Sequence, residues 1–207
     1  MNATGPAIPP HLAPRQGELV MFEDNRLLER LSRISPVTVA AVFGPVIVAS
    51  AALSIRHGTG VGETALLFAA GALFWSLFEY VFHRFVFHFD PHGPFQERLQ
   101  FILHGVHHQY PNDRDRLVMP VTVSIPLAAL FLWGFLAVLD TSGWGFFAGF
   151  AAGYLGYDMM HYAIHHAENV RHPLFRTVRR HHLAHHFRDT RRGFGVSTPV
   201  WDRVFRT

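Results

Sequence analysis

The sequence predicts an all-α integral membrane protein with four transmembrane helices, and three observations support this prediction. Apolar residues make up 49% of the 207 residues, charged residues make up only 16%, and the apolar residues gather in four stretches that carry almost no charge. Soluble domains contain about 25% charged residues. The length suits one domain of ordinary size.

The four apolar stretches run from Pro36 to Ile55, from Thr64 to Phe78, from Leu117 to Leu139 and from Gly143 to Tyr157. A helix needs about 20 apolar residues to cross a membrane, so the first and third stretches are long enough by themselves. The second and fourth are shorter and run into Glu79 and Asp158. For these two, the alternative is a buried helix of a soluble protein, which the mean hydropathy of only +0.15 favours.

The distribution of arginine favours four spans and gives their orientation. All 18 basic residues are Arg, and if the four stretches cross the membrane in turn, only Arg56 falls on the side opposite the other 17. Cytoplasmic loops are enriched in Arg and Lys, so both termini and the large middle loop are predicted to be cytoplasmic. The use of Arg without Lys hints at a GC-rich genome and a bacterial inner membrane. In a eukaryote the corresponding membrane is that of the endoplasmic reticulum.

The chain is predicted to have two parts. Residues 1–34 are rich in proline and lack a long apolar run, so they are interpreted as a flexible or amphipathic arm rather than a signal peptide. Residues 35–207 are predicted to form one membrane domain.

Sixteen histidines are the outlier of the composition, and most of them fall in four clusters. The clusters are His83–His88, His104–His108, His161–His166 and His181–His186. Residues three or four apart on a helix share one face, so each cluster can present several imidazoles together. The chain has no Cys, so nitrogen and oxygen must hold any metal. Ten well-spaced histidines exceed the ligand number of one ion and suit two.

The five-residue step from His83 to His88 leaves one face of an ideal helix, so the helix is expected to end or distort there.

The remaining histidines are assigned no function. The doublet partners His166 and His181 are placed outside the ligand set. The isolated histidines are interpreted as surface or core residues, and they are His11, His57, His92 and His172.

Two carboxylates lie close to the histidine clusters. Glu79 precedes His83 by one helical turn, and Asp158 lies three residues before His161. Carboxylates at membrane depth are costly and usually functional. A metal-bound histidine donates its other N–H to a carboxylate or a carbonyl. Glu79 and Asp158 are therefore interpreted as residues that orient ligands, or occasionally as ligands. The alternative is that they cap helix ends or pair with Arg.

Several motifs between residues 79 and 205 carry a resemblance to a known family. They are HRFVFH, HGVHHQYPNDRDRLVMP, YDMMHYAIHH, RRHHLAHH and GFGVSTPVWDRVF. The chain resembles the fatty acid hydroxylase and sterol desaturase superfamily of membrane di-metal oxygenases. It is most similar to the fatty acid 2-hydroxylases that act on acyl chains of sphingolipids. One H-x-x-H-H motif is a weak signal, whereas four clusters in this order with the R-L-V-x-P stretch and the G-F-G-V-S tail are specific.

The resemblance implies four transmembrane helices with a cytosolic helical cap that holds a histidine-rich di-metal site. It implies O2-dependent hydroxylation at C2 of a fatty acyl chain, either free or in a ceramide-type sphingolipid. The implied cofactors are two Fe ions, with Zn as a substitute in purified protein, and O2 is the co-substrate. The implied metal ligands are His83, His88, His104, His107, His108, His161, His165, His182, His185 and His186.

The resemblance also implies partners. The substrate is a membrane lipid. Some relatives carry a fused cytochrome b5 domain, which does not fit before Glu79, so the electrons are expected from a separate donor of cytochrome b5 or ferredoxin type with its reductase. A nucleic acid partner is not expected, although the isoelectric point is near 9.8, because half of the chain is membrane-like.

Two alternatives stay open. The first is a sterol or carotenoid oxygenase, or a desaturase, of the same superfamily, which the histidines alone do not distinguish. The second is a non-enzymatic membrane protein that binds or transports metal. That class predicts histidines and acidic residues inside the spans, whereas the clusters here lie at the predicted cytoplasmic ends.

Overall fold

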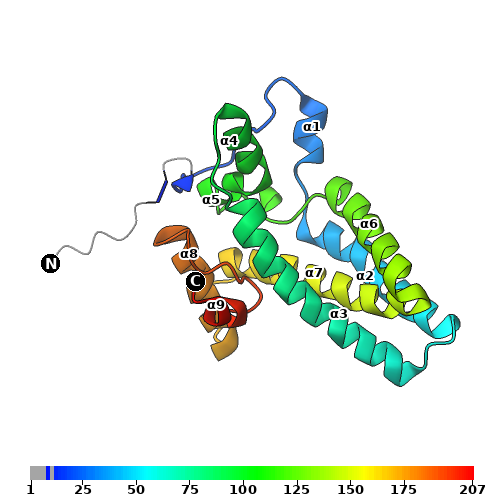
Figure 1. Ribbon diagram of the computed structural model, residues 1–207. Coiled ribbons are helices and arrows are strands. Elements are labelled where there is room, and N and C mark those ends of the chain that lie inside the picture. The colour runs from blue at the N-terminus through cyan, green and yellow to red at the C-terminus, as the bar shows by residue number, and fades with distance from the viewer. Residues whose placement is uncertain (1–7, 10–11) are drawn as a thin grey trace. The chain divides into compact units, whose positions relative to one another are not determined.

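The computed structural model describes residues 8–9 and 12–207 (Figure 1). The described residues form helices and contain no strand, which confirms the all-α prediction. They divide into two compact units. The histidine unit comprises the described residues up to Met21, Phe78–Leu117 and Met160–Thr207, and the apolar unit comprises Phe22–Leu77 and Val118–Met159.

The apolar unit is built from four long helices and one short one. They are α1 (Arg26–Leu31), α2 (Pro36–Arg56), α3 (Val61–Phe82), α6 (Val121–Leu139) and α7 (Gly143–His166). The last residues of α3 and of α7 belong to the histidine unit. The two shorter apolar stretches of the sequence lie in the two longest of these helices, α3 with 22 residues and α7 with 24. They continue past Glu79 and Asp158, and both carboxylates are buried.

Three helical runs of the described chain are long and apolar enough to cross a membrane. They are Pro36–Arg56, Val61–Phe87 and Arg114–His166. The third run contains both α6 and α7, which are joined by a 3-10 turn at Asp140–Ser142. Large apolar side chains are exposed along these runs, among them Leu66, Trp133 and Val138. Such an extensive apolar surface suits lipid rather than water. The membrane prediction is confirmed, whereas the number of four spans stays a prediction.

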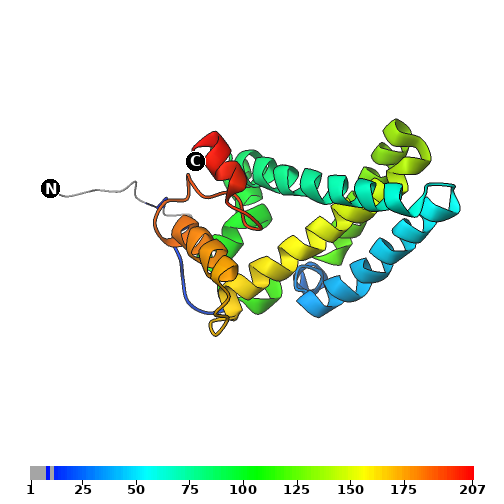
Figure 2. The same ribbon diagram turned by 90° about the horizontal axis from the view of Figure 1, so that it is seen from below.

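Close backbone contact holds α3 against α7 within the apolar unit. A Cβ atom added at Gly149 would lie 1.8 Å from the Phe68 carbonyl oxygen, and one added at Gly71 would lie 2.0 Å from the Phe146 carbonyl oxygen. Small residues allow this approach of helices in membranes. Trp75 of α3 also packs on Phe150 of α7, with ring centroids 5.0 Å apart. Figure 2 shows α7 running between α2 and α3.

The histidine unit is built from short helices around the ends of α3 and α7. They are the π-helix His83–Phe87, α4 (Pro94–Gln100), the π-helix Phe101–Gly105, α5 (Val106–Gln109), the 3-10 turn Arg114–Arg116, α8 (Pro173–Phe187) and α9 (Val200–Phe205). The helix distortion expected after His83 is confirmed, because the His88 N–H donates to the His83 carbonyl at 3.1 Å. A π turn is wider than an α turn, and here it brings residues five apart to one side.

Part of the chain before α1 packs on the histidine unit. The Arg15 N–H donates to the Gln109 carbonyl at 2.5 Å, and Arg116 Nε donates to the Leu19 carbonyl at 3.2 Å. Leu12 and Met21 are buried. Residues 12–21 of the predicted arm are therefore bound to the loop that follows α5. The domain boundary after residue 34 stays a prediction.

Candidate metal centre

Ten histidine side chains of the histidine unit gather in two groups of five. Within each group, one ring nitrogen of each residue lies within 4.8 Å of those of the other four. The first histidine group comprises His83, His88, His104, His108 and His185. The second histidine group comprises His107, His161, His165, His182 and His186. The structure thus brings together the same ten residues that the resemblance implies as ligands.

Each H-x-x-H-H motif contributes to both groups. In the motif that begins at His104, the outer pair four residues apart joins the first group, and His107 joins the second. In the motif that begins at His182, the outer pair His182 and His186 joins the second group, and His185 joins the first. The pair His83 and His88 completes the first group. The pair His161 and His165 completes the second, so the two groups are built to the same plan.

The ring nitrogens converge at distances typical of ligands that share one ion. The Nε2 atom of His104 lies 3.0 Å from that of His83 and 3.1 Å from that of His108. The Nε2 atom of His182 lies 3.1 Å from those of His161 and His165. An imidazole nitrogen has one hydrogen or one lone pair, so it cannot bond well to two such neighbours. Nitrogens about 2.1 Å from one ion and at right angles to each other are about 3.0 Å apart.

His186 gives the strongest indication of a missing partner. Its side chain is fully buried, and neither ring nitrogen has a hydrogen-bond partner among the described residues. An unpaired buried polar group costs about 1–3 kcal/mol. A metal ion would bind one of these nitrogens, so the residues present fit a metal. Five imidazoles without thiolate suit Fe, Zn, Cu and Ni.

The two groups lie against each other. The rings of His108 and His186 are stacked, with centroids 4.1 Å apart and planes at 15°. The rings of His107 and His108, which are neighbours in the chain, have centroids 5.9 Å apart. Two ions held by the groups would therefore be near neighbours within one buried site.

Burial keeps these imidazoles neutral, as metal binding requires. It lowers the pKa of His185 to about 3, and repulsion from His83 adds to the effect. Burial, reinforced by neighbouring imidazoles, also holds the pKa well below the ordinary value for a further set of ligands. These residues are His104, His107, His108, His182 and His186.

Acidification is expected to destabilise the metal-free protein. Unfolding returns each imidazole to a pKa of about 6.5, so below that pH the unfolded chain binds more protons than the folded chain. The free energy of unfolding therefore falls as the pH falls, by up to about 1.4 kcal/mol per pH unit for each such histidine. The thermal midpoint of metal-free protein at pH 7.5, 6.5 and 5.5 measures this effect. A midpoint that stays constant or rises on acidification would contradict the neutral buried state.

Backbone carbonyls orient two ligands of the first group. His83 Nδ1 donates to the Phe194 carbonyl at 2.5 Å, and His185 Nδ1 donates to the Arg192 carbonyl at 2.7 Å. A proton on Nδ1 leaves the lone pair on Nε2, the atom that faces the other histidines. Both carbonyls belong to residues 192–198, the tail loop. Carbonyl oxygens of the tail loop therefore orient two ligands of the first group.

Glu79 reaches the site through the tail loop. Its side chain is 4% exposed and accepts hydrogen bonds from the Val196 N–H at 2.6 Å, from the Ser197 N–H at 2.8 Å and from the Ser197 hydroxyl. The Arg nearest to Glu79 in the chain, Arg84, donates to the Tyr80 hydroxyl at 2.8 Å. Glu79 therefore secures the loop that carries the Phe194 carbonyl, and its functional role stays a proposal.

Substitution of Glu79 by glutamine is expected to weaken metal binding about 10–100-fold, as is typical for residues that support ligands. Glutamine keeps one acceptor oxygen for the two N–H groups but loses the negative charge and the acceptor that faces the Ser197 hydroxyl, so the tail loop would be held less firmly beside His83. Metal content after dialysis and turnover both measure the effect. Unchanged metal content together with unchanged turnover would remove Glu79 from the site.

Asp158 lies in the apolar unit, outside both histidine groups. It is 1% exposed, and its Oδ2 atom has no hydrogen-bond partner among the described residues. Its role as an orienting residue stays a prediction.

The remaining histidines lie outside both groups in the described chain. The His181 Nε2 atom bonds to Asp202 at 3.0 Å, and His166 packs on Tyr162 with ring centroids 4.7 Å apart. His57 stacks on Trp144 with centroids 6.4 Å apart. His92 and His172 are exposed, and His11 lies outside the described residues.

Sequence reasoning missed Asp202 and the carbonyl acceptors of the tail loop. Asp202 is 2% exposed and accepts bonds from His181 and from the N–H groups of Phe194 and Gly195. Burial acts to raise the pKa of Asp202, but these hydrogen bonds outweigh burial and hold the pKa below its ordinary value. The glycines on either side of Phe194 were the one local signal of an irregular backbone.

Comparisons with known proteins agree with this geometry. The sequence profile of the fatty acid hydroxylase family matches residues 68–207. Dihydroceramide fatty acyl 2-hydroxylase FAH1 of Arabidopsis thaliana is 36% identical over 171 residues, which cover 82% of this chain and 71% of that protein. Fatty acid 2-hydroxylase of Mus musculus is 40% identical over 144 residues, which cover 68% of this chain but only 39% of the mouse protein.

A solved structure has the same fold. It is that of full-length Scs7p, in which only the hydroxylase domain is visible. It matches with a TM-score of 0.82 and 35% identity over 88% of this chain and 69% of that one. The profile match, the identities and the two histidine groups confirm the resemblance seen in the motifs. The chain belongs to the fatty acid hydroxylase family, a family of oxidoreductases.

Proposed function

We propose that this protein hydroxylates C2 of a fatty acyl chain, either free or in a ceramide-type sphingolipid, in a reaction that consumes O2. One observation carries the proposal: ten imidazoles, most of them buried, form two adjacent groups of five in a chain without cysteine. The names of the relatives support the position of hydroxylation, because they are fatty acid and dihydroceramide fatty acyl 2-hydroxylases. The apolar helical runs support a substrate that resides in the membrane.

The two groups are proposed to hold two iron ions. Iron would supply the activation of O2, because no side chain can attack an unactivated C–H bond. Zinc binds nitrogen ligands more tightly than Fe(II) and has no redox chemistry, so zinc in a purified sample would be a substitute. Five donors in each group exceed the four that a structural zinc site uses.

The protein itself orients the ligands and excludes water. The tail loop fixes the tautomers of His83 and His185 through its carbonyl oxygens. Most of the ten histidine side chains are buried, with 0% exposure for His108, His182 and His186. A dry site keeps the imidazoles neutral and protects a reactive oxidant from side reactions with water.

The electron donor is proposed to be a separate protein of cytochrome b5 or ferredoxin type with its reductase.

The proposed topology has four spans with both termini in the cytoplasm, supported by the 17 Arg on one side. The chain has no Cys, so single cysteines can be placed freely. A cysteine in place of exposed Arg191 should react only from the cytoplasmic side, and one in place of exposed Glu63 only from the other side. The reverse labelling would contradict this topology.

Product analysis tests the proposed function. Purified protein in lipid vesicles, loaded with Fe(II) and supplied with a reduced donor and O2, is expected to convert acyl chains to 2-hydroxy acyl chains. Mass spectrometry with acyl chains deuterated at C2 should show loss of one deuterium and gain of one oxygen. An oxidised sterol, a desaturated acyl chain or the absence of any product would contradict the proposal, and the first two would identify a related oxygenase instead.

A further inference from the structure

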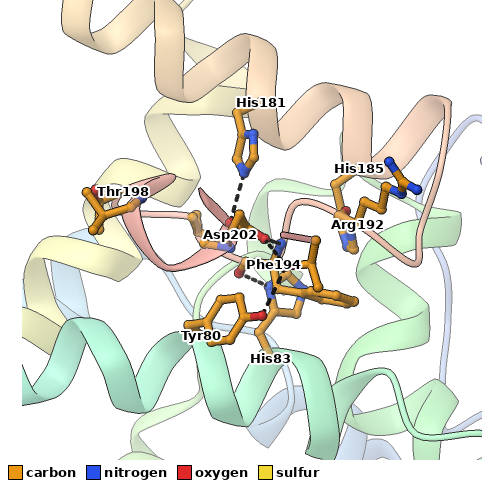
Figure 3. A network of polar contacts seen from close by, with 12 residues as sticks. Tyr80, His83, His181, His185, Arg192, Phe194, Thr198 and Asp202 are labelled. Carbon is orange, nitrogen blue, oxygen red and sulfur yellow. Dashed lines mark hydrogen bonds and ion pairs between the residues drawn. The ribbon is translucent and has the colours of Figure 1, made fainter. Parts of the chain in front are cut away.

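Asp202 lies at the centre of a buried hydrogen-bond network around the tail loop. Its carboxylate accepts bonds from the Phe194 N–H and the Gly195 N–H, both at 2.8 Å. It also accepts bonds from the Thr207 hydroxyl and from His181 Nε2, both at 3.0 Å. Figure 3 shows His181 pointing from α8 toward Asp202, with His83 and Phe194 on the other side of the carboxylate. Asp202 thus ties α8 and the tail loop to α9.

The segment that Asp202 holds is the same segment that orients the first histidine group. Asp202 binds the N–H of Phe194, while the carbonyl of Phe194 accepts the Nδ1 proton of His83. Two residues earlier, the Arg192 carbonyl accepts the Nδ1 proton of His185. Both acceptors serve ligands of the first group. A displacement of the loop would therefore turn these two imidazoles away from their shared ion.

The two carbonyl contacts of the tail loop go to the first histidine group, whereas in the second group the His161 imidazole bonds to the Leu117 carbonyl. The Nδ1 atoms of His107, His182 and His186 are buried and have no hydrogen-bond partner among the described residues. The two groups share one plan of ligands but differ in what holds those ligands. This difference predicts unequal metal sites.

The glycines of the tail loop allow the close contact with Asp202. A Cβ atom added at Gly195 would lie 2.1 Å from the Thr198 carbonyl oxygen and 2.8 Å from Asp202 Oδ2. Gly193 has φ +77°, a conformation that other residues rarely adopt. The sequence G-F-G is therefore required where the loop presents its carbonyls to the histidines.

We propose that Asp202 is a positioning residue which, through the Phe194–Gly195 peptide, sets the metal affinity of the first histidine group and not that of the second. The inference rests on the proposed two-metal site. It adds that the carboxyl-terminal segment controls the binding of one of the two ions and not of the other.

Substitution of Asp202 by asparagine tests the inference in the full-length protein. Asparagine keeps the size but turns one acceptor oxygen into an N–H donor, which would face the N–H of Phe194 or Gly195. Titration of metal-free protein with Co2+ alone, followed by absorption, should show one site weakened about 10–100-fold and the other unchanged. Mass-spectrometric metal content after dialysis should fall from two ions per chain toward one.

Double variants assign the weakened site. Adding His83→Ala, which removes a ligand of the first group, to Asp202→Asn should cause little further loss of metal. Adding His186→Ala, which removes a ligand of the second group, should remove most of the remaining ion. Effects that combine in this way show coupling to the first group. The opposite pattern would overturn the inference.

Two further variants keep the test decisive. Thr207→Val removes one donor to Asp202 and preserves the carboxylate, so it should weaken the same site less, and it carries the test if Asp202→Asn does not fold. Glu97→Gln changes an exposed carboxylate and should change neither site. Equal weakening of both sites by Asp202→Asn, or no weakening, would overturn the inference. Wild-type protein that binds fewer than two ions would instead overturn the proposed function, before any variant is measured.

Discussion

Substitution of His186 by leucine is expected to abolish hydroxylation and, at the same time, to stabilise the metal-free protein. His186 is fully buried, and both of its ring nitrogens lack a partner among the described residues. Without metal, this residue carries an unpaired polar group that costs about 1–3 kcal/mol, and an apolar side chain of similar size relieves that cost. With metal, the second group loses a ligand, so activity should fall by more than the roughly 100-fold typical of supporting residues.

The matched control for this variant is His166→Leu. His166 is also a histidine next to a ligand in the chain, but it lies outside both groups. It should retain metal content and turnover. Thermal midpoints of metal-free wild type and His186→Leu, together with product formation by the loaded proteins, measure the two effects. A His186→Leu protein that still hydroxylates, or whose metal-free form is less stable than wild type, would contradict the assignment.

Removal of metal by a chelator is expected to abolish activity and to lower the thermal midpoint substantially. A ligand that binds only the folded state stabilises it by about 2.7 kcal/mol when its concentration is 100 times Kd. Two independent sites would give about 5 kcal/mol, which corresponds to a shift of about 10–20 °C for a chain of this size. The convergence of five ring nitrogens in each group explains the effect, because these ligands lie together only in the folded state.

Reconstitution separates the structural role of the metal from its chemical role. Fe(II) should restore both the midpoint and the activity. Zn(II) should restore the midpoint and leave the protein inactive, because zinc supports no redox chemistry. Hydroxylation by the zinc-loaded protein, or a midpoint that chelation does not change, would show that the histidine groups do not act as proposed.

Much of the fold follows from composition and pattern. Low charge, four apolar stretches and one-sided Arg predicted an all-α membrane protein, and the described helices agree. The lengths of α3 and α7 followed only in part, because the apolar stretches end at Phe78 and Tyr157, whereas the helices end at Phe82 and His166. Glu79 and Asp158 are buried in these helices, and burial depends on neighbours that are distant in the chain, such as Val196 beside Glu79.

The candidate site, too, could be predicted only in part from the sequence. Sequence spacing identified pairs such as His104 and His108, because residues four apart share a helix face at any place in a fold. Spacing suggested that His107 would point with them, yet His107 belongs to the other group. Its assignment depends on where α7 and α8 lie, and no local pattern contains that information.

The sequence by itself determined the membrane class, the identity of the clustered imidazoles and the family, because hydropathy, helical spacing and motif order are local properties of the chain. Only the tertiary structure decided how the histidines divide between two groups, and which atoms orient them. His83 and Phe194 are 111 residues apart, and Glu79 and Val196 are 117 residues apart. Contacts over such separations form only when packed helices bring distant segments together, so they could not be predicted from the sequence alone.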